Sequence, residues 1–371
     1  MKILFLLAAK AHTPNDRNMN HFQRVYFLSR DADLTVLGVK GADFSVSAAP
    51  GMKIIEASSR SKLAVILKAF QMAVTGRARQ YDIILSEPSL VCLGAFALKL
   101  FSRAKWVVDV WDIPIRCLVN VGRTMRAYRA LTRFLLKTAF KRADLFLLSI
   151  MPDFEFKYFK VPERKMFLLP NAIWRDVEPG PRKPAQGVFE LVAMRTFFSR
   201  DMGLDVLAKA FLKLEGKIEN LRLTLVGRMT PEVEDQIAPL RGKTNVEFIE
   251  STPHDKVMEI IGRSRVCVIP YRDVVDLSQI LPIKVLEYLV TGVPIVASDL
   301  PNMRRMIRPG KDGLLFKPGD SDDLERNIFR LYEDTELSDS IRNRSPKLDP
   351  KLDCRTKNKR IVERLKELVR S

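Results

Sequence analysis

The chain has 371 residues, 47% of them hydrophobic, which is enough for two domains that each bury a core. No stretch approaches the roughly 20 apolar residues of a membrane-spanning helix. The four cysteines are scattered, which argues against a disulfide framework or a zinc site, and only three histidines are present, which argues against a histidine metal site. The formal net charge is +18, of which residues 1–180 carry +13 (28 basic minus 15 acidic residues), and such a field attracts phosphates, nucleic acid or anionic lipid.

The first half of the chain alternates short apolar runs with longer helical patterns. Residues 3–9 are too short for a signal-peptide core and indicate a first buried strand, and the scattered cysteines fit a reducing cytoplasm. The runs are mostly continuous rather than alternating, which is typical of strands buried on both faces of a parallel sheet. Helices are expected at residues 60–77, 89–102 and 123–142, and strands at 2–9, 34–39, 53–57, 82–86, 105–110, 144–149 and 166–169.

A linker is expected at residues 178–187, which hold three prolines and two glycines in ten positions. The alternation then restarts, so the sequence predicts two doubly wound α/β domains, at 1–177 and 188–350, and a final helix within 351–371 that returns to the first domain. Ligands of such sheets bind outside the carboxyl ends of the strands, and we expect the two domains to face a shared cleft. Helices are expected at 203–214, 231–240, 254–263, 283–291 and 321–332, and strands at 189–194, 221–226, 246–249, 266–270, 294–298 and 313–316.

Residues 266–298 combine a buried strand, an irregular loop and a helix that begins at Pro282, where the missing N–H of proline costs nothing. The N–H groups around Ile283 form an anion site at the helix N-terminus, and Lys284 adds a cation. Glu287, one turn further on, can accept hydrogen bonds from two adjacent hydroxyls, such as those of a ribose. The segment therefore predicts a site for a nucleotide diphosphate.

This segment resembles the retaining glycosyltransferases with the GT-B fold (family 4, or group 1), which include sucrose synthases, mannosyltransferases and transferases of polysaccharide or glycolipid biosynthesis. The shared pattern is proline-x-lysine-x-x-glutamate-tyrosine followed by glycine-x-proline, at residues 282–288 and 292–294. The resemblance implies two Rossmann-like domains and makes Glu287 a ligand of the nucleotide ribose. It extends to Pro170-Asn171 at the end of the first domain and, in the second, to residues 203–211.

Two positions depart from the family pattern. Gln279 stands where the family often has the first glutamate of its Glu-x7-Glu element, and Met202 stands where it often has a lysine that contacts the diphosphate. Arg195 or Arg200 could replace that lysine, and Arg195 is favoured because a strand end points into the expected cleft. Asp112 precedes Ile-Pro and is either a cleft residue or a turn-initiating aspartate. The candidate catalytic residues are Asp112, Gln279 and Arg195, and the candidate donor-binding residues are Pro282, Ile283, Lys284, Glu287, Arg195 and Arg200.

One face of the helix expected at 123–142 is uniformly basic. Six Lys and Arg residues follow one another at spacings of three or four with no acidic residue between them, while Tyr128, Leu131, Phe134 and Leu135 are expected on the buried side. A uniformly positive surface favours contact with an anionic membrane. The alternative is that these side chains are simply exposed to solvent. Nucleic-acid binding is not favoured because no stacking aromatics are interleaved with the charges. The six residues are Arg123, Arg126, Arg129, Arg133, Lys137 and Lys141.

These features predict a retaining, metal-independent glycosyltransferase that uses a nucleotide-diphosphate sugar, such as a UDP- or GDP-sugar, and needs no cofactor. The acceptor is expected to be a glycan or a lipid-linked glycan at the cytoplasmic face of the membrane, because in this fold the first domain binds the acceptor and here it carries most of the charge. Two alternatives stay open: a sugar-nucleotide epimerase of the same fold, and an inactive basic protein that binds membrane or nucleic acid.

Overall fold

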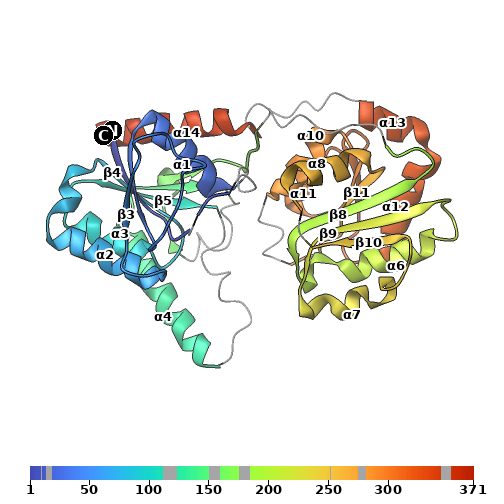
Figure 1. Ribbon diagram of the computed structural model, residues 1–371, viewed down its shortest axis with the longest axis horizontal. Coiled ribbons are helices and arrows are strands. Elements are labelled where there is room, and N and C mark those ends of the chain that lie inside the picture. The colour runs from blue at the N-terminus through green and yellow to red at the C-terminus, as the bar shows by residue number, and fades with distance from the viewer. Residues whose placement is uncertain are drawn as a thin grey trace. The chain divides into compact units, whose positions relative to one another are not determined.

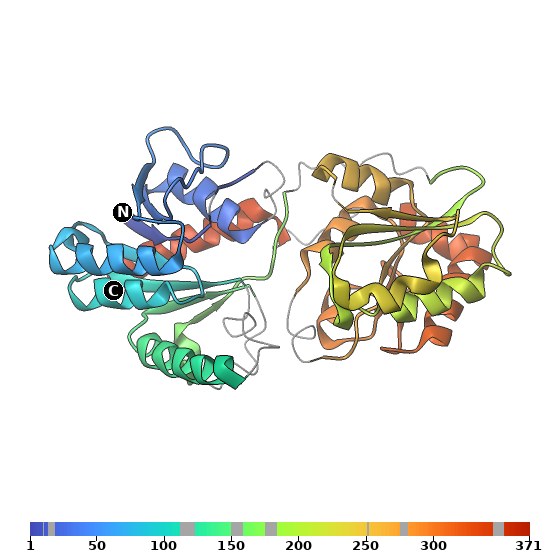
Figure 2. The same cartoon turned by 60° about the horizontal axis from the view of Figure 1, so that its bottom comes forward.

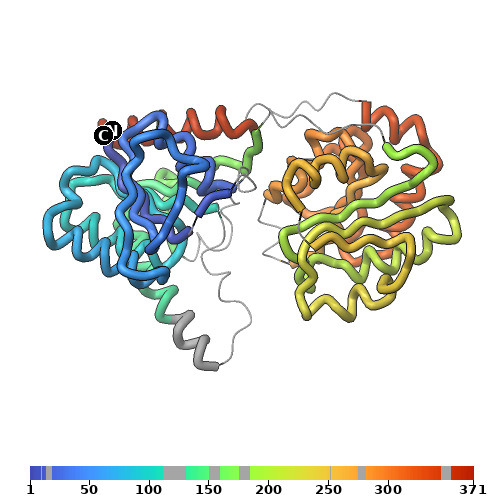
Figure 3. Tube along the Cα trace, viewed as in Figure 1, coloured from blue at the N-terminus to red at the C-terminus, as the bar shows by residue number. Residues whose placement is uncertain are grey.

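The computed structural model shows two compact units, each built around one parallel sheet (Figure 1). Unit 1 comprises Met1–Trp174 and Pro350–Ser371, and unit 2 comprises Arg175–Asp349. Figure 3 traces the chain through both units from its N-terminus to its C-terminus. The structure describes residues 1–9, 11–13, 19–111, 123–149, 159–174, 184–250, 252–274, 281–343 and 352–371, and of residues 123–130 it describes the backbone alone.

Unit 1 has a seven-stranded sheet in which all neighbouring strands are parallel, in the order β3-β2-β1-β4-β5-β6-β7. Its central strands are buried almost throughout: β4 and β6 have no exposed residue, and β1 exposes only its first residue, Lys2, as expected for a sheet covered by helices on both faces. The doubly wound fold predicted from the sequence is therefore confirmed for this unit. The strands are β1 (Lys2–Leu6), β2 (Asp33–Gly38), β3 (Lys53–Glu56), β4 (Ile83–Ser86), β5 (Lys105–Val110), β6 (Leu145–Leu148) and β7 (Met166–Leu168).

The direction of each crossover decides which face of the unit 1 sheet a helix covers. The chain moves from β1 to β2 in one direction and from β3 through β4 and β5 to β6 in the other. Because such crossovers are right-handed, the helix after β1 covers one face and the three helices that precede β4, β5 and β6 cover the opposite face. The first is α1 (Asn20–Asp31), and the other three are α2 (Lys62–Val74), α3 (Cys92–Leu100) and α4 (Arg123–Phe140).

The last helix, α14 (Cys354–Arg370), belongs to unit 1 and lies beside α1 (Figures 1 and 2). Buried polar groups join the two helices to the sheet. Arg24 of α1 pairs with Asp109 of β5 at 2.6 Å and donates from Nη1 to Asn358 Oδ1 of α14, also at 2.6 Å. Lys357 Nζ donates to Asn20 Oδ1 at 2.8 Å, and burial lowers the pKa of this amine well below its usual value. Complementary polar groups therefore fix α14 on the unit.

Unit 2 has a six-stranded parallel sheet in the order β10-β9-β8-β11-β12-β13. This is the second doubly wound sheet that the sequence predicts. Its strands are β8 (Phe189–Phe198), β9 (Leu221–Met229), β10 (Val246–Ile249), β11 (Val266–Ile269), β12 (Ile295–Ser298) and β13 (Gly313–Phe316), and its helices are α6 (Leu204–Leu214), α7 (Glu234–Ile237), α8 (His254–Arg263), α10 (Ile283–Thr291), α11 (Pro301–Met306), α12 (Ser321–Glu333) and α13 (Thr335–Asn343).

Two details of the expected helices are wrong. The single helix expected at residues 231–240 is instead the short α7 between two 3-10 turns, Pro231–Val233 and Ala238–Leu240, because Pro239 cannot donate the hydrogen bond that would continue an α-helix. In α4, Leu131 and Phe134 are 56% and 65% exposed, although the sequence pattern assigned them to the buried side. Among residues 131–140 of α4, the buried side chains are those of Thr132, Leu136, Ala139 and Phe140.

Candidate functional site

Unit 2 has a topological switch point between β8 and β11. From β8 the chain continues to β9 and β10 on one side, whereas β11 lies on the other side and leads to β12 and β13. Ligands of open parallel sheets bind at the carboxyl ends of the strands next to such a point. The residues that end these two strands and begin the helices after them are therefore the first place to look for a site.

Helix α10 begins on this carboxyl edge, after β11. Pro282 is its N-cap with φ −67° and ψ 128°, and Ile283 is its first helical residue. Gly292 ends the helix in the left-handed region with φ 71°, and its N–H donates to the carbonyl of Leu289. The helix spans the residues that the sequence predicts, and its N-terminal amides and dipole favour an anion beyond Ile283.

Glu287 lies in the second turn of α10 and is only 2% exposed. Its Oε2 is 2.9 Å from Lys284 Nζ on the same helix, and its Oε1 is 3.8 Å from Nδ1 of His254, the first residue of α8. Carboxylates are rarely buried without a charged or hydrogen-bonding partner. The two helix starts therefore hold one buried carboxylate between a lysine and a histidine. Sequence reasoning assigned no role to His254, and no local signal distinguishes it from an ordinary residue at a helix start.

Arg195 lies in β8, where the register with β9 shifts between Met194 and Phe197. Its Nη1 donates to the hydroxyl of Tyr271, which follows β11, and the guanidinium lies 5.0 Å from the centre of the Tyr271 ring. Next to it, the backbone N–H of Met194 donates to the hydroxyl of Tyr288 in α10 at 3.0 Å, and burial raises the pKa of Tyr288 well above its usual value. Two tyrosines that the sequence did not single out thus connect β8 with β11 and α10.

Gly203 brings the turn after β8 directly over the end of β11. Its φ is 68°, and a Cβ at this position would lie 1.8 Å from the carbonyl oxygen of Pro270. Only glycine fits both the left-handed backbone and this close approach. The same contact is reinforced by Arg272, which pairs with Asp205 of α6 at 2.5 Å and whose N–H donates to the carbonyl of Asp201 at 3.0 Å. The N-terminus of α6 therefore lies on the same edge as that of α10.

The structure separates the two arginines that the sequence offered as phosphate ligands. Arg195 lies at the switch point, whereas Arg200 is paired with Asp235 of α7 at 2.5 Å and donates to the carbonyl of Glu232. Met202, at the position of the usual family lysine, is buried in the core. Asp112 and Gln279 lie outside the described residues. Within the described ranges, no group of three or more His, Cys, Asp or Glu side chains is placed to hold a metal ion.

Unit 1 gathers a second set of polar groups at the carboxyl edge of its sheet. His12, after β1, contacts Ser47 Oγ through Nδ1 at 2.6 Å, and its Nε2 lies 2.8 Å from Nδ1 of His21 in α1. Asn20 Nδ2 donates to Asn171 Oδ1 at 2.9 Å, which places the Pro170-Asn171 motif beside the start of α1. His12, Asn20 and Asn171 are all buried, so these hydrogen bonds fix the edge from within.

Comparison with known proteins gives a family match for the residues of unit 2. Residues 187–348 match the family of glycosyl transferases group 1. An exopolysaccharide phosphotransferase of Streptomyces coelicolor is 28% identical over 176 residues, which is 47% of this chain and 18% of that protein. The chain therefore spans less than a fifth of the length of this curated relative.

Solved structures resemble the whole chain at low sequence identity. HepE of Anabaena in complex with UDP has a TM-score of 0.72 at 17% identity, with 99% of this chain and 100% of that chain covered. Sucrose-phosphate synthase from Thermosynechococcus elongatus has a TM-score of 0.73 at 17% identity, with 99% of both chains covered. A UDP-GlcNAc 2-epimerase from Neisseria meningitidis reaches 0.55 at 13% identity, with 99% and 100% covered. The GT-B fold is thereby confirmed, and the structures of HepE and sucrose-phosphate synthase are more similar to this chain than that of the epimerase.

Proposed function

We propose that this chain, a group 1 glycosyltransferase with the GT-B fold, transfers a sugar from a nucleotide-diphosphate donor that binds at the switch point of unit 2. The observation that carries the proposal is the buried Glu287 beside Lys284 at the start of α10. In this position Glu287 accepts hydrogen bonds from both ribose hydroxyls, while Lys284 and the first-turn amides face the diphosphate. Arg195, at the register shift within β8, adds a second cation for the phosphates.

The proposed transfer retains the anomeric configuration and does not require a metal. Charge builds up on the diphosphate as the bond to the sugar breaks, and Arg195, Lys284 and the N-terminal amides of α10 neutralise it. Retention rests on the family resemblance. We expect turnover to survive chelation with EDTA, and we expect NMR of the first product formed to show the anomeric configuration of the donor. Loss of turnover with EDTA, restored by a divalent cation, would contradict the metal-independent mechanism.

A nucleotide screen tests the donor site. Ligands that bind the native state raise the unfolding temperature. In a thermal-shift assay with UDP, GDP, ADP and their nucleotide sugars, the donor nucleotide should therefore give the largest increase. Glu287→Ala removes the charged acceptor of two hydrogen bonds and should weaken nucleotide binding about ten- to a hundredfold. Glu259→Ala, which removes an exposed glutamate of the neighbouring helix α8, is the matched control and should bind normally. Equal affinity of the two variants would refute the role of Glu287.

The acceptor side is proposed for unit 1. Hydrogen bonds among His12, His21, Asn20 and Asn171 order its carboxyl edge, and the chain in this unit carries most of the positive charge. We propose a glycan or lipid-linked glycan as acceptor, reached from the cytoplasmic face of an anionic membrane. Turnover of a nucleotide sugar to its epimer without any acceptor would instead support the epimerase alternative.

The basic residues of α4 are the proposed electrostatic contact with that membrane. Of the six, Lys141 is exposed and Arg133 and Lys137 are half-buried, while the side chains of Arg123, Arg126 and Arg129 lie outside the described residues. Replacing Arg126, Arg129 and Arg133 by Glu should weaken binding to anionic vesicles, and unchanged binding would contradict this contact.

A further inference from the structure

Helix α2 exposes a stripe of large apolar side chains. Leu63, Leu67, Phe70 and Val74 follow one another at spacings of four, three and four, which places them along one side of the helix, and each is between 52% and 62% exposed. The opposite side of α2 is also apolar and is buried against the unit. A helix that is apolar on both sides is expected to be covered on both sides.

The neighbouring helices continue this apolar surface. The end of α3 exposes Leu100 and Phe101, and α4 exposes Leu131 and Phe134. Helices α2, α3 and α4 cover the same face of the unit 1 sheet, and α3 packs against both of the others. Of the fifteen exposed large apolar side chains among the described residues, eight lie on this three-helix face. The clustering marks an interaction surface, since exposed apolar residues are otherwise scattered singly.

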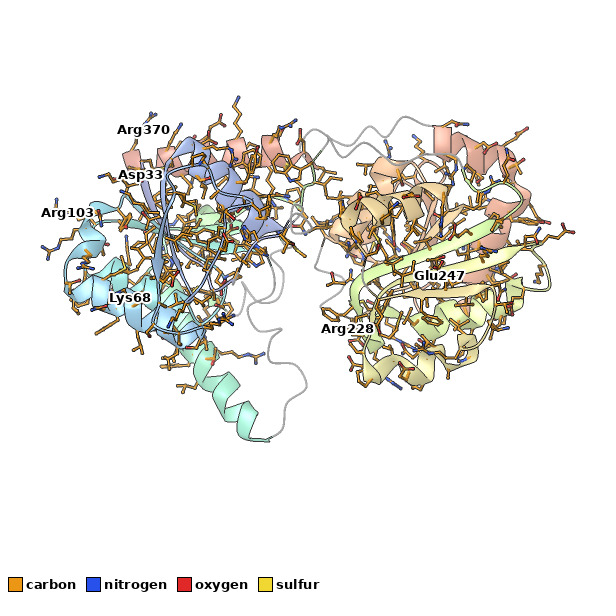
Figure 4. The ribbon with its side chains drawn as sticks, in the orientation of Figure 1. Asp33, Lys68, Arg103, Arg228, Glu247 and Arg370 are labelled. Carbon is orange, nitrogen blue, oxygen red and sulfur yellow. The ribbon has the colours of Figure 1, made fainter. Side chains whose placement is uncertain are left out.

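The charge on the three-helix face is of one sign. Residues 57–81, which contain α2, hold five Lys and Arg and no Asp or Glu. The helix residues of α3 and α4 contain no acidic residue either. Basic residues belong to these helices and to the turns after them, as do Lys68 of α2 and Arg103 after α3 (Figure 4). The partner of this surface must therefore be apolar and negatively charged at the same time.

This charge pattern argues against a second copy of the chain as the occupant. In a two-fold interface each patch faces itself, so the basic residues of one copy would oppose those of the other. The nearby carboxylates of Glu87 and Asp144 already pair with Lys62 and Lys99 of the same unit. An anionic bilayer supplies both requirements, because its headgroups carry negative charge above an apolar interior. Among the described residues no helix is both long and apolar enough to cross a bilayer.

We propose that α2, the end of α3 and α4 form a membrane-insertion face, in which Leu63, Leu67, Phe70 and Val74 enter the interfacial layer of an anionic membrane. This extends the electrostatic contact proposed for α4 and rests on that part of the proposed function, but not on the donor site in unit 2. The apolar stripe supplies the part of the binding that salt does not screen, and the basic residues select anionic lipid. The face orients unit 1, with its polar carboxyl edge, relative to acceptors in the same membrane.

Vesicle sedimentation tests the proposal. The full chain is mixed with vesicles of phosphatidylcholine, with and without phosphatidylglycerol, at low salt and at about 1 M salt, where the Debye length is only about 3 Å. The variant Leu67→Gln/Phe70→Gln removes the centre of the stripe and should bind anionic vesicles at least about tenfold more weakly. The control Leu168→Gln/Val369→Gln changes two exposed apolar residues of unit 1 outside the three-helix face and should bind like the wild type.

Each outcome distinguishes the proposal from its rivals. Binding of the α2 variant equal to that of the wild type, or no binding of the wild type to anionic vesicles, overturns the membrane-insertion face. A wild type that self-associates in sedimentation velocity through Leu67 and Phe70, without binding vesicles, assigns the face to a second copy instead. The UDP thermal shift of the same variant should equal that of the wild type, so a failure of the membrane proposal leaves the donor site in unit 2 untouched.

Discussion

The buried ion pair between Arg24 and Asp109 leads to a strong prediction about stability. Both side chains are completely buried, and the pair is 2.6 Å long. Asp109→Asn keeps the size of the side chain but removes the only carboxylate seen to pair with Arg24 among the described residues. The charge of Arg24 also acts on the nearby Lys357, whose pKa it helps to lower. Removing one partner of a buried pair costs about 3–5 kcal/mol, because the other charge remains buried.

Tryptophan fluorescence can measure this loss in unit 1 alone. All three tryptophans, Trp106, Trp111 and Trp174, belong to unit 1. With a urea m-value of about 1–3 kcal/mol per M, a loss of about 3 kcal/mol or more lowers the unfolding midpoint by at least about 1 M.

The control for this prediction is an exposed ion pair of the same unit. Glu367→Gln breaks the pair with Arg364 on α14, which is 2.9 Å long and has exposed fractions of 35% and 63%. Such a pair contributes at most about 0.5 kcal/mol. If Asp109→Asn lowers the midpoint no more than Glu367→Gln does, the pair is not an essential part of the core and the reasoning is refuted.

Three further changes test the site and the α14 contact. Gly203→Ala forces a Cβ to within 1.8 Å of a carbonyl oxygen at φ 68°, so we expect it to abolish the UDP thermal shift, whereas Gly216→Ala, which has open space around it, should keep the shift. Tyr288→Phe leaves a buried amide without its acceptor and should destabilise unit 2 by about 1–3 kcal/mol in denaturation followed by circular dichroism; an unchanged free energy would contradict it. Because burial lowers the pKa of Lys357, the unfolded state binds this proton more tightly, and the contribution of Lys357 to stability is present above pH 10.5 and lost as the pH falls towards the folded pKa. The free energy of unfolding of the wild type relative to Lys357→Met should therefore rise from about pH 8 to about pH 10, and a flat or falling difference would show that the amine is not desolvated.

Features fixed by local chemistry could be predicted from the sequence. Helix α10 was predicted to its last residue because Pro282 and Gly292 determine both ends through their own backbone preferences. Tyr271 and Tyr288 show where this reasoning stops. Each contacts β8, at Met194 or Arg195, only because the sheet order places β11 and α10 beside that strand, so the partner lies far away in sequence. The sequence pattern identified the residues of α10, but it did not predict that Tyr288 accepts a hydrogen bond from the backbone of β8.

Helix α4 shows a different limit, which concerns the direction of an apolar stripe. Its sequence contains two such stripes, one with Leu131 and Phe134 and the other with Leu136, Ala139 and Phe140, and either could have faced the sheet. The spacing of apolar residues in the sequence shows which of them share one side of the helix, but the three-dimensional fold decides which side is buried. Once the second stripe packs on the unit, the first is left on the surface with basic neighbours. An exposed apolar stripe of this kind lowers solubility in water and adds no packing within the chain. Together with the exposed apolar residues of α2 and α3 on the same face, it indicates contact with an external apolar surface.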